Sequence, residues 1–494
     1  MGGARAGPVA RAAAQPDTSR RTTVADPGHA PAHGTEFDVL ILGAGSGGYA
    51  CALRAAQLGL SVGLVEADKV GGTCLHVGCI PTKALLHAAE VADSARESER
   101  FGVRATLEGI DMAGVNSYKD GVVARLHKGL TGLVKGRGIT VIEGRGTLTG
   151  PREVTVVGTA YSGRHLVLAS GSYARTLPGL EVDGERVLTS EHALRLEHVP
   201  ASVVVLGGGV IGCEFASVWR SFGAEVTIVE ALPRLVAAED PASSKALERA
   251  FRKRGIAFRT ATRSTGVERT ETGVRVDIED DKGGTGSIEA ELLLVAVGRG
   301  PATDGLGYAE QGVAMERGFV LADEHGRTNL EGVYAVGDIV PGLQLAHRGF
   351  QQGVHVAEHI AGLDPVPVPE SSIPRVTYSH PEIASVGLDE ETARSTYGAD
   401  AVETLTYDLG GNGKSQIVQT QGFVKLVRQV DGPVLGVHMV GDRVGELIGE
   451  AQLICAWEAH PEDVTPLLHA HPTQNEALGE AHLALAGKAL HAHG

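Results

Sequence analysis

Residues 37–48 read Phe-Asp-Val-Leu-Ile-Leu-Gly-Ala-Gly-Ser-Gly-Gly, and this stretch decides the fold class. Its first half is a short apolar run, which is typical of a buried strand in a parallel sheet. Its second half is a G-x-G-x-x-G pattern formed by Gly43, Gly45 and Gly48. Glycines in this order let the backbone approach a pyrophosphate closely, at the point where a helix begins.

The residues that follow complete the unit that such a glycine pattern needs. A helix is expected to run to Leu58, and a second strand over Ser61–Val65 ends directly before Glu66. An acidic residue in this place can accept a hydrogen bond from a ribose hydroxyl. The sequence therefore predicts a strand–helix–strand unit that binds a dinucleotide.

A second unit of the same kind follows later in the chain. The strand Val203–Leu206 leads into another glycine pattern, and the strand Glu225–Val229 leads into Glu230. The glycines of this pattern are Gly207, Gly209 and Gly212. They and the acid keep one constant offset of 164 residues from the first unit. Chance glycines would not stay in step in this way, so two complete dinucleotide units are predicted.

A cysteine pair follows the first unit, in the stretch 71–83, which reads Gly-Gly-Thr-Cys-Leu-His-Val-Gly-Cys-Ile-Pro-Thr-Lys. A bridge between Cys74 and Cys79 is plausible if the segment between them turns, which Gly78 allows. Pro81 suits the first turn of a helix, so Cys79 would lie near the positive end of a helix dipole, which favours a thiolate. Two such thiols can cycle between disulfide and dithiol.

The cysteines could instead be unpaired core residues or half of a zinc site. The chain has five cysteines, no second pair completes a zinc site, and the spacing is not the usual metal one. One cysteine pair in a cytosolic protein is more often catalytic than structural. We therefore favour a redox-active pair.

The connectivity of the chain assigns a cofactor to each unit. The cysteine stretch leaves directly from the first unit, so a two-electron carrier bound there would lie near the sulfurs. A flavin exchanges electrons with both a hydride donor and a disulfide, so the first unit is expected to bind FAD and the second a nicotinamide. Glu230 favours NAD, because a carboxylate repels the 2′-phosphate of NADP, although Arg234 lies near enough to leave NADP open.

Other apolar runs end in residues that suit a flavin site. The run that starts at Leu166 ends in Ser170 and Gly171, where the backbone could pass close to a flavin. The strand 332–338 ends at Asp338, which could hold the ribityl chain or could be a plain turn aspartate. Further strands are expected at Ile139–Ile142, Val154–Val157 and Leu292–Val297.

The pattern changes to that of an α+β module from Ile373 onward. Strands are expected at Tyr378–Glu382, Gly422–Val427 and Leu435–Val440. Helices are expected at about 446–460 and 474–485.

The segment 469–476, between those helices, reads His-Ala-His-Pro-Thr-Gln-Asn-Glu. A dithiol reaction needs a base near the attacked sulfur, and histidine titrates in the useful range. Glu476 could orient His471 and stabilise its charged form, as the acid of a catalytic triad does. The alternative is a surface histidine cluster. His469 and His471 could also chelate a metal, but no third ligand is evident, so no metal site is predicted.

The bulk composition is that of a globular protein of about three domains. Of the 494 residues, 43% are hydrophobic and 21% are charged. The net charge of −16 argues against nucleic acid or an anionic membrane as a partner. No apolar run reaches membrane-spanning length, and a cytoplasmic protein is expected.

Taken together, these motifs resemble those of the pyridine nucleotide–disulfide oxidoreductases. The resemblance runs from about Phe37 to Ala486 and is most specific in the segments 71–83 and 469–476. It implies an FAD-containing homodimer that oxidises dihydrolipoyl groups, borne on carrier domains of 2-oxo-acid dehydrogenase or glycine cleavage complexes, and reduces NAD. It also implies that His471 of one subunit meets the disulfide of the other.

The resemblance implies an α/β fold with two Rossmann-like domains and a C-terminal α+β dimerisation domain. An FAD-binding domain with the redox disulfide is expected over 36–188 and an NAD-binding domain over 189–305. A central segment over 306–370 would complete the FAD site, and the interface domain would cover 371–494. Residues 1–35 contain no apolar stretch of the secretory type, so a disordered extension is expected there, and a targeting role is the less favoured alternative.

By the same resemblance, Cys79 would be the sulfur nearer the flavin and Cys74 the one that exchanges with substrate. Lys83 and Glu214 would pair near the flavin ring. The remaining implied contacts are Gly146, Asp338 and Ala346 for the flavin and Gly298 for NAD.

The alternative within the family is an NADPH-dependent reductase of another low-molecular-weight disulfide, such as glutathione. Glutathione reductases carry arginines where this chain has Glu230. A non-catalytic scaffold subunit is a third hypothesis, but a scaffold does not require these reactive groups. One departure from the family pattern is His76, where many members have Asn, and it could shift the pKa of the redox loop.

Overall fold

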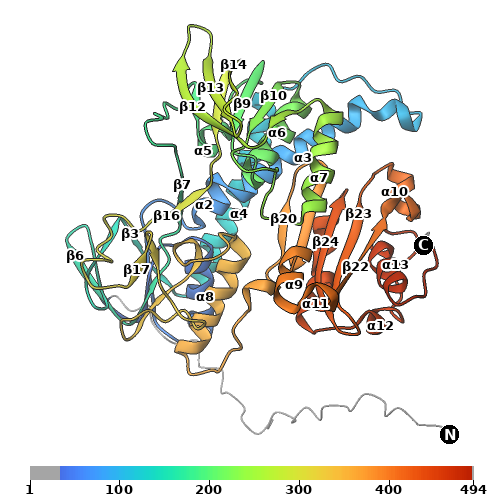
Figure 1. Ribbon diagram of the computed structural model, residues 1–494. Helices are drawn as coiled ribbons and strands as arrows, with labels where there is room; N and C mark the ends of the chain where they lie inside the picture. Colours follow the sequence, from blue (N-terminus) through green and yellow to red (C-terminus); the bar gives the residue numbers. More distant parts are fainter. Residues whose placement is uncertain (1–33, 492–494) are drawn as a thin grey trace, which may run out of the picture.

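The computed structural model describes residues 34–491 of the chain. The expected extension over 1–35 lies outside the described residues, except for Gly34 and Thr35. The described chain forms two α/β units, the first built on a mixed sheet and the second on a parallel sheet, and a C-terminal α+β module, which is drawn in orange and red in Figure 1. The predicted fold class is therefore confirmed. No helix among these residues is long and apolar enough to cross a membrane.

The first sheet is built around β1 (Glu36–Leu42), which pairs in parallel with β2 (Val62–Glu66) and β6 (Thr159–Leu168). Residues 39–41 of β1 are fully buried, as a parallel strand covered on both faces requires. The other strands of this sheet are β3 (Thr140–Glu143), β4 (Gly146–Gly150), β5 (Glu153–Val156) and β19 (Val333–Ala335). Since β19 pairs with β6, a segment far downstream completes the sheet.

Two helices pack closely beside this sheet, α1 (Ser46–Gln57) and α8 (Ala346–Ile360). A side-chain carbon on Gly353 of α8 would lie only 2.2 Å from the carbonyl oxygen of Gly47 in α1. The helices therefore touch backbone to backbone, which only glycine allows. The segment 306–370 thus packs on the first unit through both β19 and α8.

The second sheet is parallel and has the order β11–β10–β9–β15–β8. Its strands are β8 (Val187–Leu188), β9 (Ser202–Leu206), β10 (Glu225–Val229), β11 (Ala257–Arg259) and β15 (Leu292–Val295). Its main helices are α6 (Val210–Phe222) and α7 (Pro241–Arg254). An antiparallel sheet of β12 (Thr262–Arg269), β13 (Val274–Asp280) and β14 (Thr285–Ala290) extends from it at the top of Figure 1. Because β8 pairs with β15, residues 187–188 belong to this second sheet.

The C-terminal module is a five-stranded antiparallel sheet covered by helices. In sheet order its strands are β20 (Arg375–Thr377), β21 (Glu382–Gly387), β24 (Val434–Gly441), β23 (Phe423–Gln429) and β22 (Val402–Asp408). The helix α11 (Ile448–Ala456) packs on β21 and β24, and α13 (Glu476–Leu485) packs on β22 and β23. The helix expected at about 446–460 is therefore shorter than predicted.

The strand predicted over Tyr378–Glu382 is wrong. The structure ends β20 at Thr377 and begins β21 only at Glu382, with a turn between them. In that turn the amide of Tyr378 donates to Glu214 at 3.0 Å and the amide of His380 donates to Ser217 at 3.2 Å. These amides are bonded to α6, so they are not available to a neighbouring strand.

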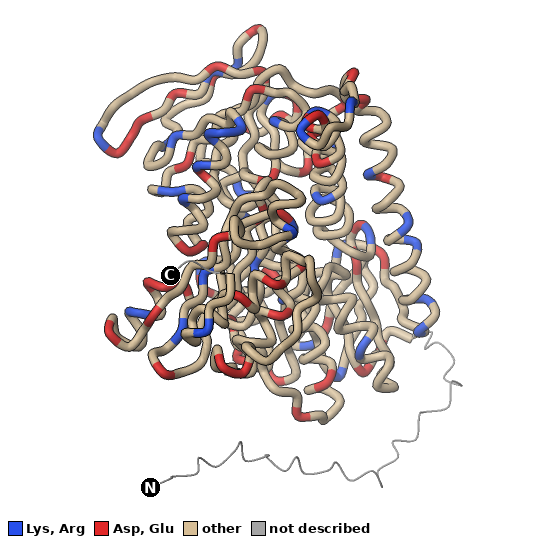
Figure 2. The backbone as a smooth tube through the Cα atoms, turned by 90° about the vertical axis from the view of Figure 1, so that its right-hand side faces the viewer, with Lys and Arg blue, Asp and Glu red and all other residues tan. Residues whose placement is uncertain are grey.

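Charges of both signs are interspersed along the described chain in the view of Figure 2. One group of charged side chains is buried between the second unit and the C-terminal module. Lys425 of β23 donates to both carboxylate oxygens of Asp240, at 2.9 and 3.1 Å, and lies 2.8 Å from Glu390. The side chain of Asp240 is fully buried and that of Lys425 is 8% exposed. Asp240 also caps α7 by accepting a hydrogen bond from Ala242.

We expect Lys425→Met to lower the free energy of unfolding by about 3–5 kcal/mol, because it leaves the carboxylate of Asp240 buried and unpaired. Denaturant unfolding followed by circular dichroism measures this loss. The matched control is Lys135→Met at an exposed position of α4 (Met112–Gly136), which should change the same quantity by less than about 0.5 kcal/mol. A loss as small as that of the control would show that the pair contributes little.

Candidate active site

The two glycine loops have nearly the same backbone geometry. Gly43 and Gly207 have φ angles of +106° and +105°, which residues with a side chain rarely adopt. A side-chain carbon on Gly48 would lie 1.8 Å from the carbonyl oxygen of Gly43, and one on Gly212 would lie 1.9 Å from that of Gly207. The first and last glycine of each loop are therefore required by the turn itself.

The middle glycines face open space. Apart from the glycine itself and its two chain neighbours, no heavy atom of the described residues lies within 4 Å of a side-chain carbon built on Gly45 or Gly209. These two residues are the N-caps of α1 and α6, and neither helix start has a side-chain cap in the structure. Each loop thus offers room and unpaired helix N–H groups, which fit a pyrophosphate.

The two predicted ribose-binding acids occupy equivalent places. Glu66 accepts a hydrogen bond from the amide of Ala44 at 2.7 Å, and Glu230 accepts one from the amide of Gly208 at 2.5 Å. Each carboxylate is thereby held at the rim of its glycine loop and keeps lone pairs for a hydroxyl donor. The guanidinium of Arg234 donates to the carbonyl of Ala237 at 2.8 Å, within its own loop.

The small residues after β6 meet the segment that contains Asp338. The hydroxyl of Ser172 donates to the carboxylate of Asp338, and Arg299 donates to the same hydroxyl at 2.8 Å. Ser170 is bonded to the hydroxyl of the buried Tyr308 at 3.0 Å. Sequence reasoning did not find Tyr308, Ser172 or Arg299, because no local pattern marks a contact between segments so far apart.

The other predicted cofactor contacts differ in their surroundings. A side-chain carbon on Gly146 would lie 2.6 Å from Leu42 and 2.7 Å from Val154, so packing in the first sheet requires a glycine there. Ala346 begins α8. Gly171 and Gly298 both have positive φ angles, +79° and +109°, and they directly precede β7 (Ser172–Ala174) and β16 (Arg299–Pro301), which pair with each other.

The cysteine pair lies on two consecutive helices, α2 (Gly72–Val77) and α3 (Cys79–Arg96). Cys74 is inside α2, Cys79 is the first residue of α3, and both are free thiols in this structure. Gly78 forms the break, where a side-chain carbon would lie 2.9 Å from the carbonyl oxygen of Thr73. The helix start near Pro81 was predicted, whereas α2 was not.

The two thiols have opposite pKa shifts. A hydrogen bond from the side chain of Cys74, assisted by the positive charge of Lys83, lowers the pKa of Cys79 to about 7 although burial opposes this. The same hydrogen bond, together with burial, raises the pKa of Cys74. The pair therefore holds one proton on Cys74 and a thiolate on Cys79 near neutral pH, and its titration belongs to both groups.

An ion pair joins the redox helix to the second unit. The ammonium group of Lys83 lies 2.9 Å from both carboxylate oxygens of Glu214, whose side chain is 3% exposed on α6. Tyr378 supports this pair in two ways, because its amide donates to Glu214 and its ring lies 4.7 Å from the ammonium group. The contribution of Tyr378 was not predicted from the sequence.

The predicted histidine–glutamate pair is formed at the start of α13. Nδ1 of His471 lies 2.9 Å from Oε1 of Glu476, and the amide of Thr473 donates to Oε2 at 2.7 Å. Partial burial would raise the pKa of Glu476, but these two donors outweigh it and lower that pKa. The imidazole of His471 is 78% exposed, and α13 lies across the C-terminal module from α2 (Figure 1). One chain alone does not bring this pair to the cysteines.

His469 has a different partner, so the two histidines do not share a ligand set. Its Nε2 lies 2.9 Å from Glu450, which also accepts a hydrogen bond from Asn475 at 2.6 Å. Among residues 34–491, no group of three or more His, Cys, Asp or Glu side chains is arranged to hold a metal ion.

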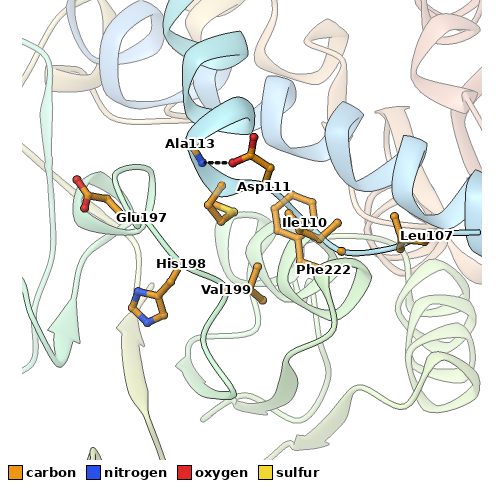
Figure 3. Close-up of a pocket in the computed structure, with 10 residues that line it drawn as sticks. Leu107, Ile110, Asp111, Ala113, Glu197, His198, Val199 and Phe222 are labelled. Atoms are coloured by element: carbon orange, nitrogen blue, oxygen red, sulfur yellow. Dashed lines mark hydrogen bonds between the residues drawn. The ribbon is translucent and has the colours of Figure 1, made fainter.

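A cleft of about 510 Å³ lies elsewhere, between the segment 107–113 that leads into α4 and the loop 197–199, with Phe222 at its wall (Figure 3). Its apolar floor contains no predicted site residue, and His198 on its rim is already bonded to Glu291 at 2.7 Å. The cleft therefore takes no part in the site described above.

Comparison with protein families supports this picture of the chain. The family model described as pyridine nucleotide-disulphide oxidoreductase matches residues 37–353. The model of the dimerisation domain of the same family matches residues 373–482.

Similar individual proteins span nearly the whole chain. A dihydrolipoyl dehydrogenase of Bacillus subtilis (strain 168) is 41% identical over 473 residues, which cover 92% of this chain and 99% of that protein. A mitochondrial dihydrolipoyl dehydrogenase of Pisum sativum is 38% identical and covers 92% of this chain and 93% of that protein. The crystal structure of LpdA from Mycobacterium tuberculosis superposes with a TM-score of 0.83 at 27% identity, covering 90% of this chain and 99% of that chain.

Proposed function

This chain belongs to the pyridine nucleotide-disulphide oxidoreductase family, and we propose that it oxidises protein-bound dihydrolipoyl groups to lipoyl groups while reducing NAD⁺. Relatives about 40% identical over most of the chain are named dihydrolipoyl dehydrogenases. The observation that carries the proposal is the position of the cysteine pair. A side-chain carbon on Gly72 of α2 would lie 2.7 Å from Cα of Gly45, so the helix of Cys74 starts against the first glycine loop.

The residues present fit FAD at the first loop and NAD at the second. Both loops offer open space at the middle glycine, uncapped helix N–H groups and a carboxylate at the rim. When bound, FAD would supply a ring that takes two electrons from the dithiol and passes them to NAD⁺ as a hydride. Asp338 would face the ribityl chain, and Lys83 with Glu214 would lie beside the ring.

The chemical step uses groups of the protein and the substrate. His471 accepts a proton from a substrate thiol, and the thiolate formed attacks the sulfur of Cys74 in the Cys74–Cys79 disulfide. The bond between the cysteines breaks, and Cys79 leaves as the thiolate that its lowered pKa favours. The second substrate thiol then attacks the mixed disulfide, releasing oxidised lipoyl and the thiol of Cys74.

Glu476 acts through His471. Its carboxylate accepts a hydrogen bond from Nδ1, which leaves Nε2 free to take the substrate proton and stabilises the imidazolium that forms. Lys83 contributes a positive charge near Cys79, which favours the thiolate. Glu214 keeps that charge in place from the second unit.

The family's dimerisation domain, matched at 373–482, supports a homodimer. In that dimer we place His471 of one subunit at the cysteine pair of the other, because the two sites lie apart within one chain. Lipoyl-bearing carrier domains of 2-oxo-acid dehydrogenase complexes are the proposed partners, and a cytoplasmic location is the proposed setting.

We expect the protein to prefer NAD⁺ over NADP⁺, because Glu230 would lie near the additional phosphate. Glu230→Gln keeps a hydrogen-bond acceptor for Gly208 but removes the charge, so the ratio of kcat/KM for NAD⁺ to that for NADP⁺ should fall about tenfold, a change of about 1.4 kcal/mol. The control is Glu225→Gln, at the exposed start of β10, the strand that leads into Glu230. It should leave the ratio unchanged. An equal ratio in wild type and Glu230→Gln would exclude this role.

The experiment that tests the function compares two reactions of the purified protein. One is NADH formation from dihydrolipoamide and NAD⁺, and the other is NADPH oxidation by glutathione disulfide. The proposal predicts a rate in the first reaction that exceeds the second by orders of magnitude. A higher rate in the second reaction would instead establish an NADPH-dependent disulfide reductase.

A further inference from the structure

His76 lies between the two reactive cysteines in the sequence but points away from them. It follows Cys74 by two residues on α2, and two residues of an α-helix turn through about 200°. Its Nε2 lies 3.0 Å from the carbonyl oxygen of Val70, in the loop that leads from β2 into α2. A carbonyl can only accept, so Nε2 of His76 carries the proton and donates.

Together with two other contacts, this hydrogen bond holds both ends of α2 near the first glycine loop. The amide of Gly71, next to Val70, donates to the carbonyl of Ala44 in the first glycine loop at 2.8 Å. The start of α2 lies against Gly45 of the same loop. His76 therefore ties the far end of α2 back to a segment that is itself fixed on the glycine loop.

A second histidine packs against this bond. The ring of His127 on α4 lies edge-on to that of His76, with ring centroids 4.9 Å apart and planes at 76°. Neutral rings attract in this geometry, whereas two imidazolium ions repel. Burial lowers the pKa of His127 most, and the nearby His76 and Lys69, which lies in the adjoining loop, lower it further. The helix α3 also packs on α2, and its Lys83 is bonded to Glu214.

The position of α2 matters for the reaction because Cys74 must stay within hydrogen-bonding reach of Cys79. The hydrogen bond from Cys74 is the largest cause of the lowered pKa of Cys79. A six-residue helix has little stability of its own, so its orientation depends on anchors at its ends.

We propose that His76 is a positioning residue that latches α2, and with it Cys74, to the first nucleotide-binding unit, and that His127 makes this latch sensitive to protonation. The inference extends the proposed function by adding a residue that acts through Cys74 and does not touch the substrate. Protonation of His127 adds a positive charge beside Lys69 and the ring of His76, which loosens the latch and weakens the hydrogen bond between the cysteines.

The test measures the cysteine pair itself. In the FAD-loaded protein, reduced with dithiothreitol and freed of it, the rate of alkylation by iodoacetamide is followed from pH 4.5 to 9. His76→Leu removes the donor and should raise the midpoint of this profile by about one pH unit. His76→Gln retains an N–H donor at a similar reach and should restore the midpoint. The control His87→Gln changes an exposed histidine of α3, bonded to Glu90, and should have no effect.

His127→Gln tests the second part of the proposal and serves if His76→Leu does not fold. The wild type should depart from a single ionisation curve below about pH 6, where histidines become charged, and His127→Gln should not. A His76→Leu profile that superposes on the wild type, or a wild-type curve identical to that of His127→Gln, would overturn the proposal. Neither dihydrolipoamide nor NAD is present in this test. The role of His76 can therefore be refuted while the proposed activity stands, and the proposed activity can be refuted while the role of His76 stands.

Discussion

Cys79→Ser is expected to reduce the rate of NADH formation from dihydrolipoamide by about a thousandfold or more, as loss of an essential reacting sulfur does. A hydroxyl cannot form the disulfide that the substrate thiolate attacks. It also cannot provide the thiolate that the lowered pKa of Cys79, about 7, makes available near neutral pH. The stopped-flow or steady-state absorbance of NADH measures the effect directly.

Two controls separate lost chemistry from lost structure. Cys455→Ser changes a thiol on α11, whose pKa burial raises to about 12, and it should retain the wild-type rate. Cys79→Ser itself should still transfer electrons from NADH to an artificial acceptor such as ferricyanide, since that reaction does not require the cysteines. Normal turnover of dihydrolipoamide by Cys79→Ser would exclude the mechanism.

Glu476→Gln is expected to lower kcat by between about 10² and 10⁴, the range found when a base or the residue that orients it is changed. The side-chain oxygen of the glutamine can still accept a hydrogen bond from the backbone N–H of Thr473, so the local fold is preserved. It no longer stabilises a charged His471, which is the state formed when a substrate thiol loses its proton. The ratio kcat/KM for NAD⁺ should stay within about twofold, because a general base acts only in the dithiol half of the reaction.

The chain supplies a matched control for this variant. His469 and Glu450 form a second histidine–carboxylate pair at 2.9 Å, but the side chain of His469 is only 10% exposed. Glu450→Gln should therefore leave kcat within about threefold of the wild type. If Glu476→Gln turned over as fast as Glu450→Gln, Glu476 would have no catalytic role.

Local sequence patterns predicted the two nucleotide-binding units well, because a glycine loop is decided by its own backbone. Gly43 and Gly207 need positive φ angles, and Gly48 and Gly212 leave no room for a side chain. Such requirements are visible in one short stretch. The constant offset of 164 residues between the units appears in the structure as nearly equal geometry at both loops.

Contacts between distant segments were predicted less well. The strand expected over 378–382 is a turn because Glu214 and Ser217, about 160 residues earlier, bind its amides. The helix α2 was missed because six residues are too few to show a helical period. The pairing of Asp338 with Ser172 also had no local signal. The pairing of Lys83 with Glu214 followed only from the family resemblance, since 131 positions separate the two residues.

The central claim is that electrons leave the substrate at a site built from two chains, with cysteines from one and the histidine–glutamate pair from the other. The most direct measurement mixes Cys79→Ser and Glu476→Gln subunits in equal amounts after dissociation and follows NADH formation from dihydrolipoamide. Random pairing makes half of the dimers mixed, and each mixed dimer contains one intact site of two, so about a quarter of the wild-type rate should return. A mixture no more active than the two variants measured separately would contradict the account.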